Sequence, residues 1–299
     1  MVAWAVAWQH GAAVRSLVQR RGYGPGSGRS SCECEMDAVD EAQRKAQRDE
    51  QLAETRRRLP GPGYYLVLRW IHEILRPPNY VEIGVRKGVS LRMALEGTRR
   101  IGVDPSPMLH TEYPDTRIFA LPSDEFFARH DLDDLLGAKV ALAFIDGLHL
   151  FEQVLRDFVH LERHSDPATV ILLHDCLPFD EPTSRREQTM DFYSGDVWKA
   201  ALALRRRRPE LEMMTVRTAP TGLCMVRGLD AGSRRLEKEL PEIVSAYRDL
   251  DFDYYSAHRA EMPPEIPSDR RAVGDWLRRR SPVASRERRQ DSRIAEAAS

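Results

Sequence analysis

Two apolar runs in this sequence end directly in acidic or imidazole side chains. The run KVALAFID ends in Asp146, and His149 follows three residues later. The run ATVILLHD ends in His174 and Asp175. Short apolar runs of this kind are typical of buried strands. Burying a polar group costs free energy unless it has a partner, so packing alone does not explain why the pattern occurs twice.

These side chains have the chemistry of a metal or acid–base site. Asp146, His174 and Asp175 can converge on a hard divalent cation. His149 can act as a general base, because the unperturbed pKa of histidine is about 6.5. In a purely structural interpretation, Asp146 caps the following helix and His174 is a hydrogen-bonded core histidine. The sequence leaves both interpretations open.

A second candidate site is the segment VEIGVRKGVS, which follows another apolar run. Gly84 permits a tight turn, and Gly88 permits a ligand to approach the backbone closely. About 20 residues later, Asp104 ends the next run, where a carboxylate can accept both hydroxyls of a ribose. Together these residues favour an adenosine-containing ligand over a structural turn with a capping aspartate. Arg86 stands where dinucleotide-binding loops carry their second glycine, which disfavours NAD.

The elements that must position these residues alternate along the chain. Apolar runs separated by helical patterns indicate a parallel sheet covered on both faces, which is an α/β doubly wound fold. The expected strands lie at 80–84, 100–104, 117–120, 139–146 and 168–175, and the expected helices at 88–97, 123–136, 148–164, 196–208 and 233–249. Two further runs, at 211–218 and 221–228, lie too close together for a parallel crossover and must pair antiparallel.

The rest of the chain divides by composition into four regions. Residues 1–35 contain a Gly- and Ser-rich stretch and are expected to be a flexible extension. Residues 36–78 form an N-terminal helical region, with a charged helix, a Pro-Gly-Pro-Gly break and an apolar helix. The α/β domain covers residues 79–250. Residues 251–299, rich in Pro, Arg and Ser, are expected to be a largely disordered tail.

Composition excludes several classes of protein. The 299 residues contain 45 basic and 46 acidic side chains, so the net charge of −1 argues against a dedicated nucleic-acid binder. Four scattered cysteines do not make a disulfide scaffold, and a cytoplasmic location is expected. No run approaches the roughly 20 apolar residues of a membrane span.

The motifs VEIGVRKGVS, IGVD, FIDGLH and VILLHD, in this order and spacing, resemble class I S-adenosylmethionine (SAM)-dependent methyltransferases. The resemblance covers roughly residues 64–230 and includes the antiparallel pair, which matches the last two strands of that family. The motifs are also similar to those of catechol and caffeoyl-CoA O-methyltransferases, which are cation-dependent, and of macrocin-type bacterial sugar and antibiotic O-methyltransferases. The resemblance implies a Rossmann-like sheet, mostly parallel, with a C-terminal antiparallel strand pair.

The resemblance also implies how SAM would be bound. Three residues of the first loop would surround the methionine moiety, and these are Gly84, Gly88 and Ser90. Glu82 would support that loop, and Asp104 would hold the ribose hydroxyls. The residues at the adenine would be Ser123 and Asp124, which from the sequence alone could equally cap the next helix.

The same resemblance assigns roles to the polar strand ends. Asp146 falls at the position of a metal-ligating aspartate and would also lie beside SAM. His149 stands where the cation-dependent enzymes keep a catalytic lysine, which is a departure. The His174–Asp175 pair stands where they keep an Asp-Asn pair. Asp175 remains an adequate oxygen ligand, while His174 places an imidazole where those enzymes have a carboxylate.

The expected function is therefore SAM-dependent O-methylation of a hydroxylated small molecule or sugar, with Mg²⁺ as the candidate cation. Residues 178–195 are expected to form part of the acceptor site, with Phe192 and Tyr193 as its aromatic side chains. The alternatives are a metal-independent methyltransferase and a non-catalytic SAM- or nucleotide-binding module. No nucleic-acid or membrane partner is expected, and a homo-oligomer packed through residues 37–75 is a candidate assembly.

Overall fold

The computed structural model describes residues 31–279, and the side chains from residue 42 onward. Most of the predicted flexible extension, and the end of the predicted tail, lie outside these residues. The chain divides into two units, residues 1–46 and 47–299. The described part of the first unit belongs to helix α1 (Ser31–Arg58), which was expected from residue 37. Residues 31–35, which were expected to belong to the flexible extension, are helical.

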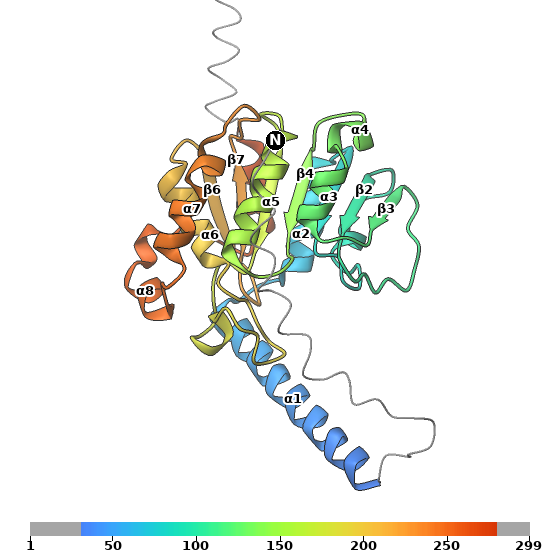
Figure 1. The fold of residues 1–299 in the computed structure, drawn as a ribbon, viewed down its shortest axis with the longest axis vertical. Helices are drawn as coiled ribbons and strands as arrows, with labels where there is room; N and C mark the ends of the chain where they lie inside the picture. The colour runs from blue at the N-terminus through green and yellow to red at the C-terminus, as the bar shows by residue number, and fades with distance from the viewer. Residues whose placement is uncertain (1–30, 280–299) are drawn as a thin grey trace, which may run out of the picture. The chain divides into compact units, whose positions relative to one another are not determined.

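The second unit contains an eight-stranded sheet with the order β3-β2-β1-β4-β5-β7-β6-β8 (Figure 1). Its strands are β1 (Asn79–Ile83), β2 (Arg99–Val103), β3 (Thr116–Phe119), β4 (Leu142–Ile145), β5 (Val170–His174), β6 (Glu212–Arg217), β7 (Leu223–Arg227) and β8 (Glu265–Pro267). The first five strands pair in parallel, and β7 lies antiparallel between β5 and β6. The predicted doubly wound sheet with a C-terminal antiparallel pair is confirmed.

Both faces of the sheet are covered because the strands are apolar on both sides. Ile171 and Leu173 of β5 join one core cluster, whereas Val170 and Leu172 join the other. The first cluster lies under the helices α3 (Ser123–Arg129), α4 (Leu132–Leu136), α5 (Phe151–Arg163), α6 (Trp198–Arg207) and α7 (Arg235–Tyr247), and the second lies under α2 (Tyr64–Leu75) and α9 (Arg270–Arg278).

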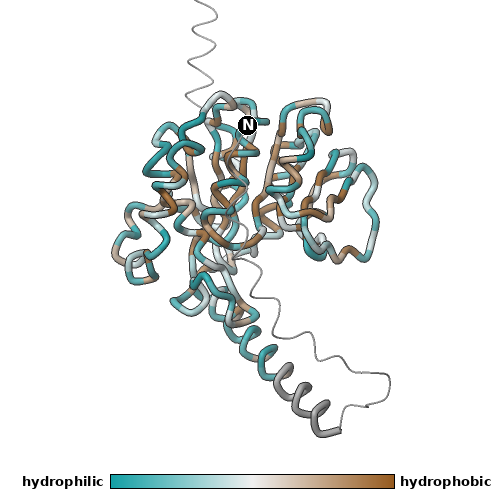
Figure 2. The backbone as a smooth tube through the Cα atoms, in the orientation of Figure 1, coloured by the Kyte–Doolittle hydropathy of each residue, from teal (hydrophilic) through white to brown (hydrophobic). Residues whose placement is uncertain are grey.

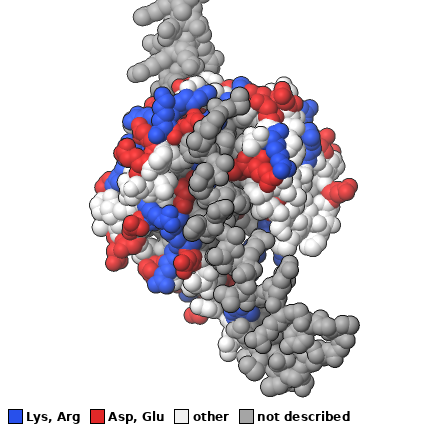
Figure 3. All heavy atoms as spheres, viewed as in Figure 1, with Lys and Arg blue, Asp and Glu red and all other residues white. Residues whose placement is uncertain are grey.

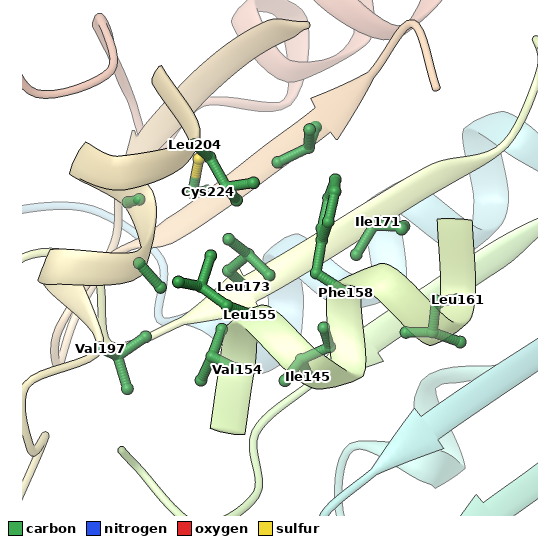
Figure 4. Packing of buried hydrophobic residues seen from close by; sticks show 14 of the residues in the cluster. Ile145, Val154, Leu155, Phe158, Leu161, Ile171, Leu173, Val197, Leu204 and Cys224 are labelled. Atoms are coloured by element: carbon green, nitrogen blue, oxygen red, sulfur yellow. The ribbon is translucent and has the colours of Figure 1, made fainter. Parts of the chain in front are cut away.

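Figures 2 to 4 show the consequences of this arrangement. The apolar residues concentrate in the strands and on the inner faces of the helices (Figure 2). In the first cluster, Phe158 and Leu155 of α5 pack on Ile171 and Leu173 of β5 (Figure 4). On the face of the molecule shown in Figure 3, acidic and basic side chains are interspersed.

Within the described residues, no helix has both the length and the apolar character needed to cross a membrane.

The helix predicted at 88–97 is reduced to a single 3₁₀ turn, η1 (Leu91–Met93). Hydrogen bonds from Arg100 of β2 account for the early end of this turn. Its guanidinium donates hydrogen bonds to the carbonyl oxygens of Ala94 (3.2 Å) and Leu95 (2.8 Å), which a longer helix would have used internally. The helix predicted at 123–136 is likewise divided in two, because Asp131 caps a separate helix, α4.

The prediction of a largely disordered tail from residue 251 was wrong for the described part. Residues 251–279 form α8 (Phe252–Ala257), the 3₁₀ turn η3 (Arg259–Glu261), β8 and α9. In α9, Val273 and Trp276 are three positions apart and bury their side chains in the cluster beneath α2. Arg227 of β7 donates a hydrogen bond to the carbonyl oxygen of Trp276 (2.9 Å) and lies over its ring. The arginine-rich composition of this region gave no sequence signal for these few contacts.

Candidate active site

The loop after β1, residues 84–90, is referred to below as the glycine loop. It lies at the carboxyl edge of the parallel sheet, against the end of β4. Gly84 has a φ of +91° and donates its N–H to the carbonyl of Val103 (2.8 Å), while Asp146 donates its N–H to Ile83 (2.8 Å). A Cβ atom on Gly84 would lie 2.0 Å from the carbonyl oxygen of Asp146. Only glycine fits, so this residue brings the loops after β1 and β4 into direct contact.

Glu82 lies beneath this loop and is fully buried. Its carboxyl oxygens accept hydrogen bonds from the hydroxyls of Ser90 (2.6 Å) and Tyr80 (2.7 Å). Burial raises the pKa of Glu82 to about 8, against the opposing effect of both hydroxyls. The contact with Ser90 is the geometry expected of a residue that supports the loop. It also turns the Ser90 hydroxyl toward Glu82.

Asp104 lies at the end of β2 and connects two loops. Its Oδ2 accepts a hydrogen bond from the N–H of Arg86 (2.7 Å), and its Oδ1 accepts one from Ser106 (2.7 Å). Each carboxylate oxygen has two lone pairs, so each can still accept a ligand hydroxyl. Gly88 lies beside the next loop, where a Cβ atom would be 2.3 Å from Cδ2 of Leu109. The loop after β2 therefore covers one side of the glycine loop.

Ser123 and Asp124 begin α3 and make side-chain contacts with α5. Gln153 donates hydrogen bonds to Ser123 Oγ (3.0 Å) and Asp124 Oδ1 (3.0 Å), and Arg156 pairs with Asp124 at 3.2 Å. Neither residue caps α3, because Pro122 occupies the N-cap position without a side-chain hydrogen bond. The capping alternative is therefore not observed, and this polar network lies at the edge where β3 ends.

The structure brings all four polar residues that follow β4 and β5 into one cluster. His174 Nδ1 lies 3.0 Å from Asp146 Oδ1 and 3.4 Å from Asp175 Oδ1. His149 Nδ1 lies 2.8 Å from Asp175 Oδ2, and His149 Nε2 lies 3.7 Å from Asp146 Oδ1. Asp146 does not cap α5, since the N-cap Leu150 makes no side-chain hydrogen bond. The convergence predicted from the strand ends is present.

The backbone of this cluster is strained at two residues. His149 and Asp175 both have a φ of +59°, in the left-handed region that favours glycine. For residues with a side chain this conformation costs roughly 1–2 kcal/mol. Such strain persists where surrounding contacts impose it, and it concentrates at functional sites.

Charge also accumulates in the cluster. Asp175 is buried, which opposes its ionisation, but His174 and His149 outweigh burial and hold its pKa well below the usual range. Burial likewise opposes the charged form of His174, yet Asp175 and Asp146 raise its pKa well above the ordinary value. The same carboxylates, Asp175 first, raise the pKa of His149 against burial. In the metal-free protein both imidazoles are therefore biased toward the protonated form.

Two contacts to the cluster come from residues that the sequence did not single out, and a third comes from the predicted acceptor segment. The ring of Tyr64, at the start of α2, lies 4.2 Å from the ring of His174, and the hydroxyl of Thr221 donates a hydrogen bond to Asp175. The ring of Tyr193 stacks on His149 at 5.7 Å, so this aromatic of the predicted acceptor segment does reach the site. Its neighbour Phe192 is buried instead.

Comparison with known proteins identifies the central part of the chain. Residues 81–176 match a family model described as a methyltransferase domain. The prediction of a methyltransferase is therefore confirmed for this segment, and the sheet order agrees with the predicted class I fold. No curated protein matches the sequence.

Several solved structures are similar to this chain at low sequence identity. One is the O-methyltransferase TomG from Streptomyces achromogenes in complex with SAM, with a TM-score of 0.40, 15% identity, and coverage of 60% of this chain and 89% of that one. A second is an O-methyltransferase from Bacillus cereus in complex with SAH, with a TM-score of 0.40, 17% identity, and coverage of 62% and 91%. A third is the SAH-bound Podospora anserina methyltransferase PaMTH1, with a TM-score of 0.43, 14% identity, and coverage of 69% and 100%.

Proposed function

We propose that this chain, whose residues 81–176 form a methyltransferase domain, methylates a hydroxyl oxygen of a small molecule or sugar with SAM as the donor. The observation that carries the proposal is the contact between two groups of residues. The glycine loop at Gly84 touches the backbone of Asp146, which belongs to the acid–imidazole cluster. A methyl donor held at the loop would therefore lie beside groups that can bind and deprotonate an acceptor.

In this proposal the loop residues and the carboxyl end of β2 hold SAM. Gly84 and Gly88 leave room for the methionine moiety, Glu82 and Ser90 fix the loop from below, and Asp104 accepts the ribose hydroxyls. The adenine would lie near Ser123 and Asp124. The sulfonium methyl is already electrophilic, so alignment with the acceptor oxygen is the main task, and alignment can contribute roughly 7–11 kcal/mol.

His149 is the proposed general base. Asp175 lies 2.8 Å from its Nδ1 and orients the ring, which leaves Nε2 as the atom that receives the acceptor proton. A positioned base contributes about 10²–10⁴-fold to the rate. Without a metal, Asp175 and Asp146 raise the pKa of His149 against burial, so turnover in the metal-independent case is expected to rise with pH.

Asp146, His174 and Asp175 fit a divalent cation. One ligand atom from each lies within 4.8 Å of the others. The Nε2 atom of His174 is buried and has no hydrogen-bond partner among the described residues. When bound, Mg²⁺ would act as a Lewis acid that lowers the pKa of an acceptor hydroxyl and orients a vicinal diol. Ligands must be deprotonated to bind a metal, so His174 would release its proton.

One observation favours the metal-independent alternative. The hydrogen-bond contact of His174 with Asp146 and that of Thr221 with Asp175 give each carboxylate a partner without an ion. In that case Asp146 would support SAM, and His149 would act alone on the acceptor.

The two functions are separated by measuring SAH formation from SAM with a panel of vicinal diols, monophenols and sugars. Loss of turnover in EDTA, restored by Mg²⁺, supports the metal-assisted reaction. The Asp146→Asn variant should then lose turnover, and the exposed control Asp230→Asn should not. Turnover that is insensitive to EDTA leaves the metal-independent enzyme. SAM binding without turnover on any acceptor would indicate a binding module.

A further inference from the structure

A partly buried ion cluster lies beside His149 and joins the segment between β5 and α6 to the helices α5 and α6. Arg186 pairs with Glu152 through both guanidinium nitrogens (2.5 and 3.0 Å) and with Asp196 Oδ2 at 2.6 Å. Lys199 also lies 3.1 Å from Asp196 Oδ2. The side chain of Asp196 is only 1% exposed. Two cations thus balance two carboxylates, one of which is withdrawn from solvent.

Asp196 connects this ion cluster to the backbone of His149. Its N–H donates a hydrogen bond to the carbonyl oxygen of His149 (3.2 Å), and its Oδ1 accepts one from the N–H of Phe151 (2.9 Å). The preceding residue approaches even more closely, since a Cβ atom on Gly195 would lie 2.0 Å from the same carbonyl oxygen of His149. These contacts enclose the strained residue from its carbonyl side.

Tyr193 connects the same ion cluster to the ring of His149. The two rings are stacked, 5.7 Å apart and inclined by 20°. The Tyr193 hydroxyl donates a hydrogen bond to the carbonyl oxygen of Arg186 (2.8 Å). Arg186 is therefore linked to His149 along two routes, one through the backbone contacts of Asp196 and one through the ring of Tyr193.

We infer that Arg186 and Asp196 are positioning residues that hold His149 in its strained backbone conformation with its ring against Tyr193. A residue at φ +59° returns to an ordinary conformation unless its surroundings prevent it. The contacts described above prevent it, together with the 2.8 Å contact between His149 Nδ1 and Asp175 Oδ2. The inference rests on the proposed function only where it treats His149 as the base, and the geometry can be tested without turnover.

The test compares Arg186→Met with Arg208→Met by NMR of protein labelled with ¹³C and ¹⁵N at histidine. Arg208 is a matched control, because it forms a buried bidentate pair (2.8 and 2.8 Å) with Glu162 near the other end of α5. The signals of His149 are assigned from the His149→Gln variant. Its Cα shift reports the backbone conformation, and its ring-proton shifts report the ring current of Tyr193. Affinity for SAH is measured in parallel by calorimetry.

The inference predicts that Arg186→Met moves both the Cα and the ring-proton signals of His149 at constant pH. Arg208→Met should leave them at the wild-type positions, even though its midpoint of denaturation falls. SAH affinity should stay within about twofold in both variants, because neither residue lies at the glycine loop. Arg186→Lys, which keeps one ion pair, should give intermediate shifts.

Unchanged His149 signals in Arg186→Met would overturn the inference, as would equal changes in Arg208→Met. If Arg186→Met does not fold, Tyr193→Leu and Asp196→Ala separate the two routes. Tyr193→Leu should change the ring-proton shifts alone, and Asp196→Ala, which removes the acceptor of the Phe151 N–H, should change the Cα shift. If the wild type does not bind SAH, the proposed function is contradicted. The test of the His149 conformation remains valid in that case, because it does not depend on SAH.

Discussion

Glu82 should make the stability of this protein fall as the pH rises, and Glu82→Gln should remove that fall. The unfolded carboxyl ionises near 4.5, whereas burial keeps the folded carboxyl protonated up to a pKa of about 8. Between these values folding takes up a proton, so the free energy of unfolding decreases as the pH increases. Each pH unit corresponds to about 1.4 kcal/mol, so Glu82 alone costs about 4 kcal/mol between pH 5 and pH 8.

The assay is urea denaturation of the wild type and Glu82→Gln at several values between pH 5 and pH 8. Glutamine is neutral throughout, so the difference in free energy of unfolding between variant and wild type should shift in favour of the variant by several kcal/mol across this range. Glu96→Gln, an exposed glutamate between β1 and β2, is the control and should track the wild type. Parallel curves for Glu82→Gln and wild type would contradict this prediction, because they would mean that the buried carboxyl ionises normally.

Three further predictions concern the site. Gly84→Ala should lower the free energy of unfolding by about 3 kcal/mol, because the added Cβ atom would clash with the backbone and the positive φ would be strained. In the control Gly97→Ala the added Cβ atom would meet nothing within 4 Å, so only the positive-φ strain should lower its stability. Similar losses for both variants in denaturation experiments would contradict the close approach of Gly84 to Asp146. Asp175→Asn should weaken Mn²⁺ binding at least tenfold in calorimetry, which corresponds to a loss of about 1.4 kcal/mol or more. Asp230→Asn should bind Mn²⁺ as the wild type does. Equal affinity of Asp175→Asn and the wild type would show that Asp175 is not a metal ligand. His149→Gln should lower turnover by about 10²–10⁴-fold without weakening SAH binding, and an unchanged rate would exclude it as the base.

The sheet could be predicted from sequence because its strands are buried on both faces. Runs such as the one ending in Asp146 are apolar throughout, and only strands between two layers of helices need that composition. The convergence of Asp146 and Asp175 followed from the same reasoning, because the carboxyl ends of adjacent parallel strands meet at one edge. The antiparallel pair followed from the short connection around Ala219–Pro220.

Features that depend on single long-range contacts could not be predicted. The pattern at 88–97 favours a helix locally. Arg100, however, donates hydrogen bonds to the carbonyl oxygens of Ala94 and Leu95, which would otherwise accept the hydrogen bonds of the next helical turn. The order of residues 251–279 depends on a few apolar side chains, among them Trp276, within a charged composition. The approach of Tyr64 to His174 depends on where α2 docks, and its position in an apolar helical pattern gave no sign of this.

Binding of SAM by the glycine loop and Asp104 is tested by calorimetric titration with SAH, with and without Mg²⁺. We expect micromolar binding to the wild type. Affinity should fall roughly 10–100-fold in Asp104→Ala, as expected when hydrogen bonds to a charged group are removed. Asp230→Ala should bind as the wild type does. If the wild type does not bind SAH under either condition, or if Asp104→Ala binds with equal affinity, this loop and Asp104 are not the SAM site.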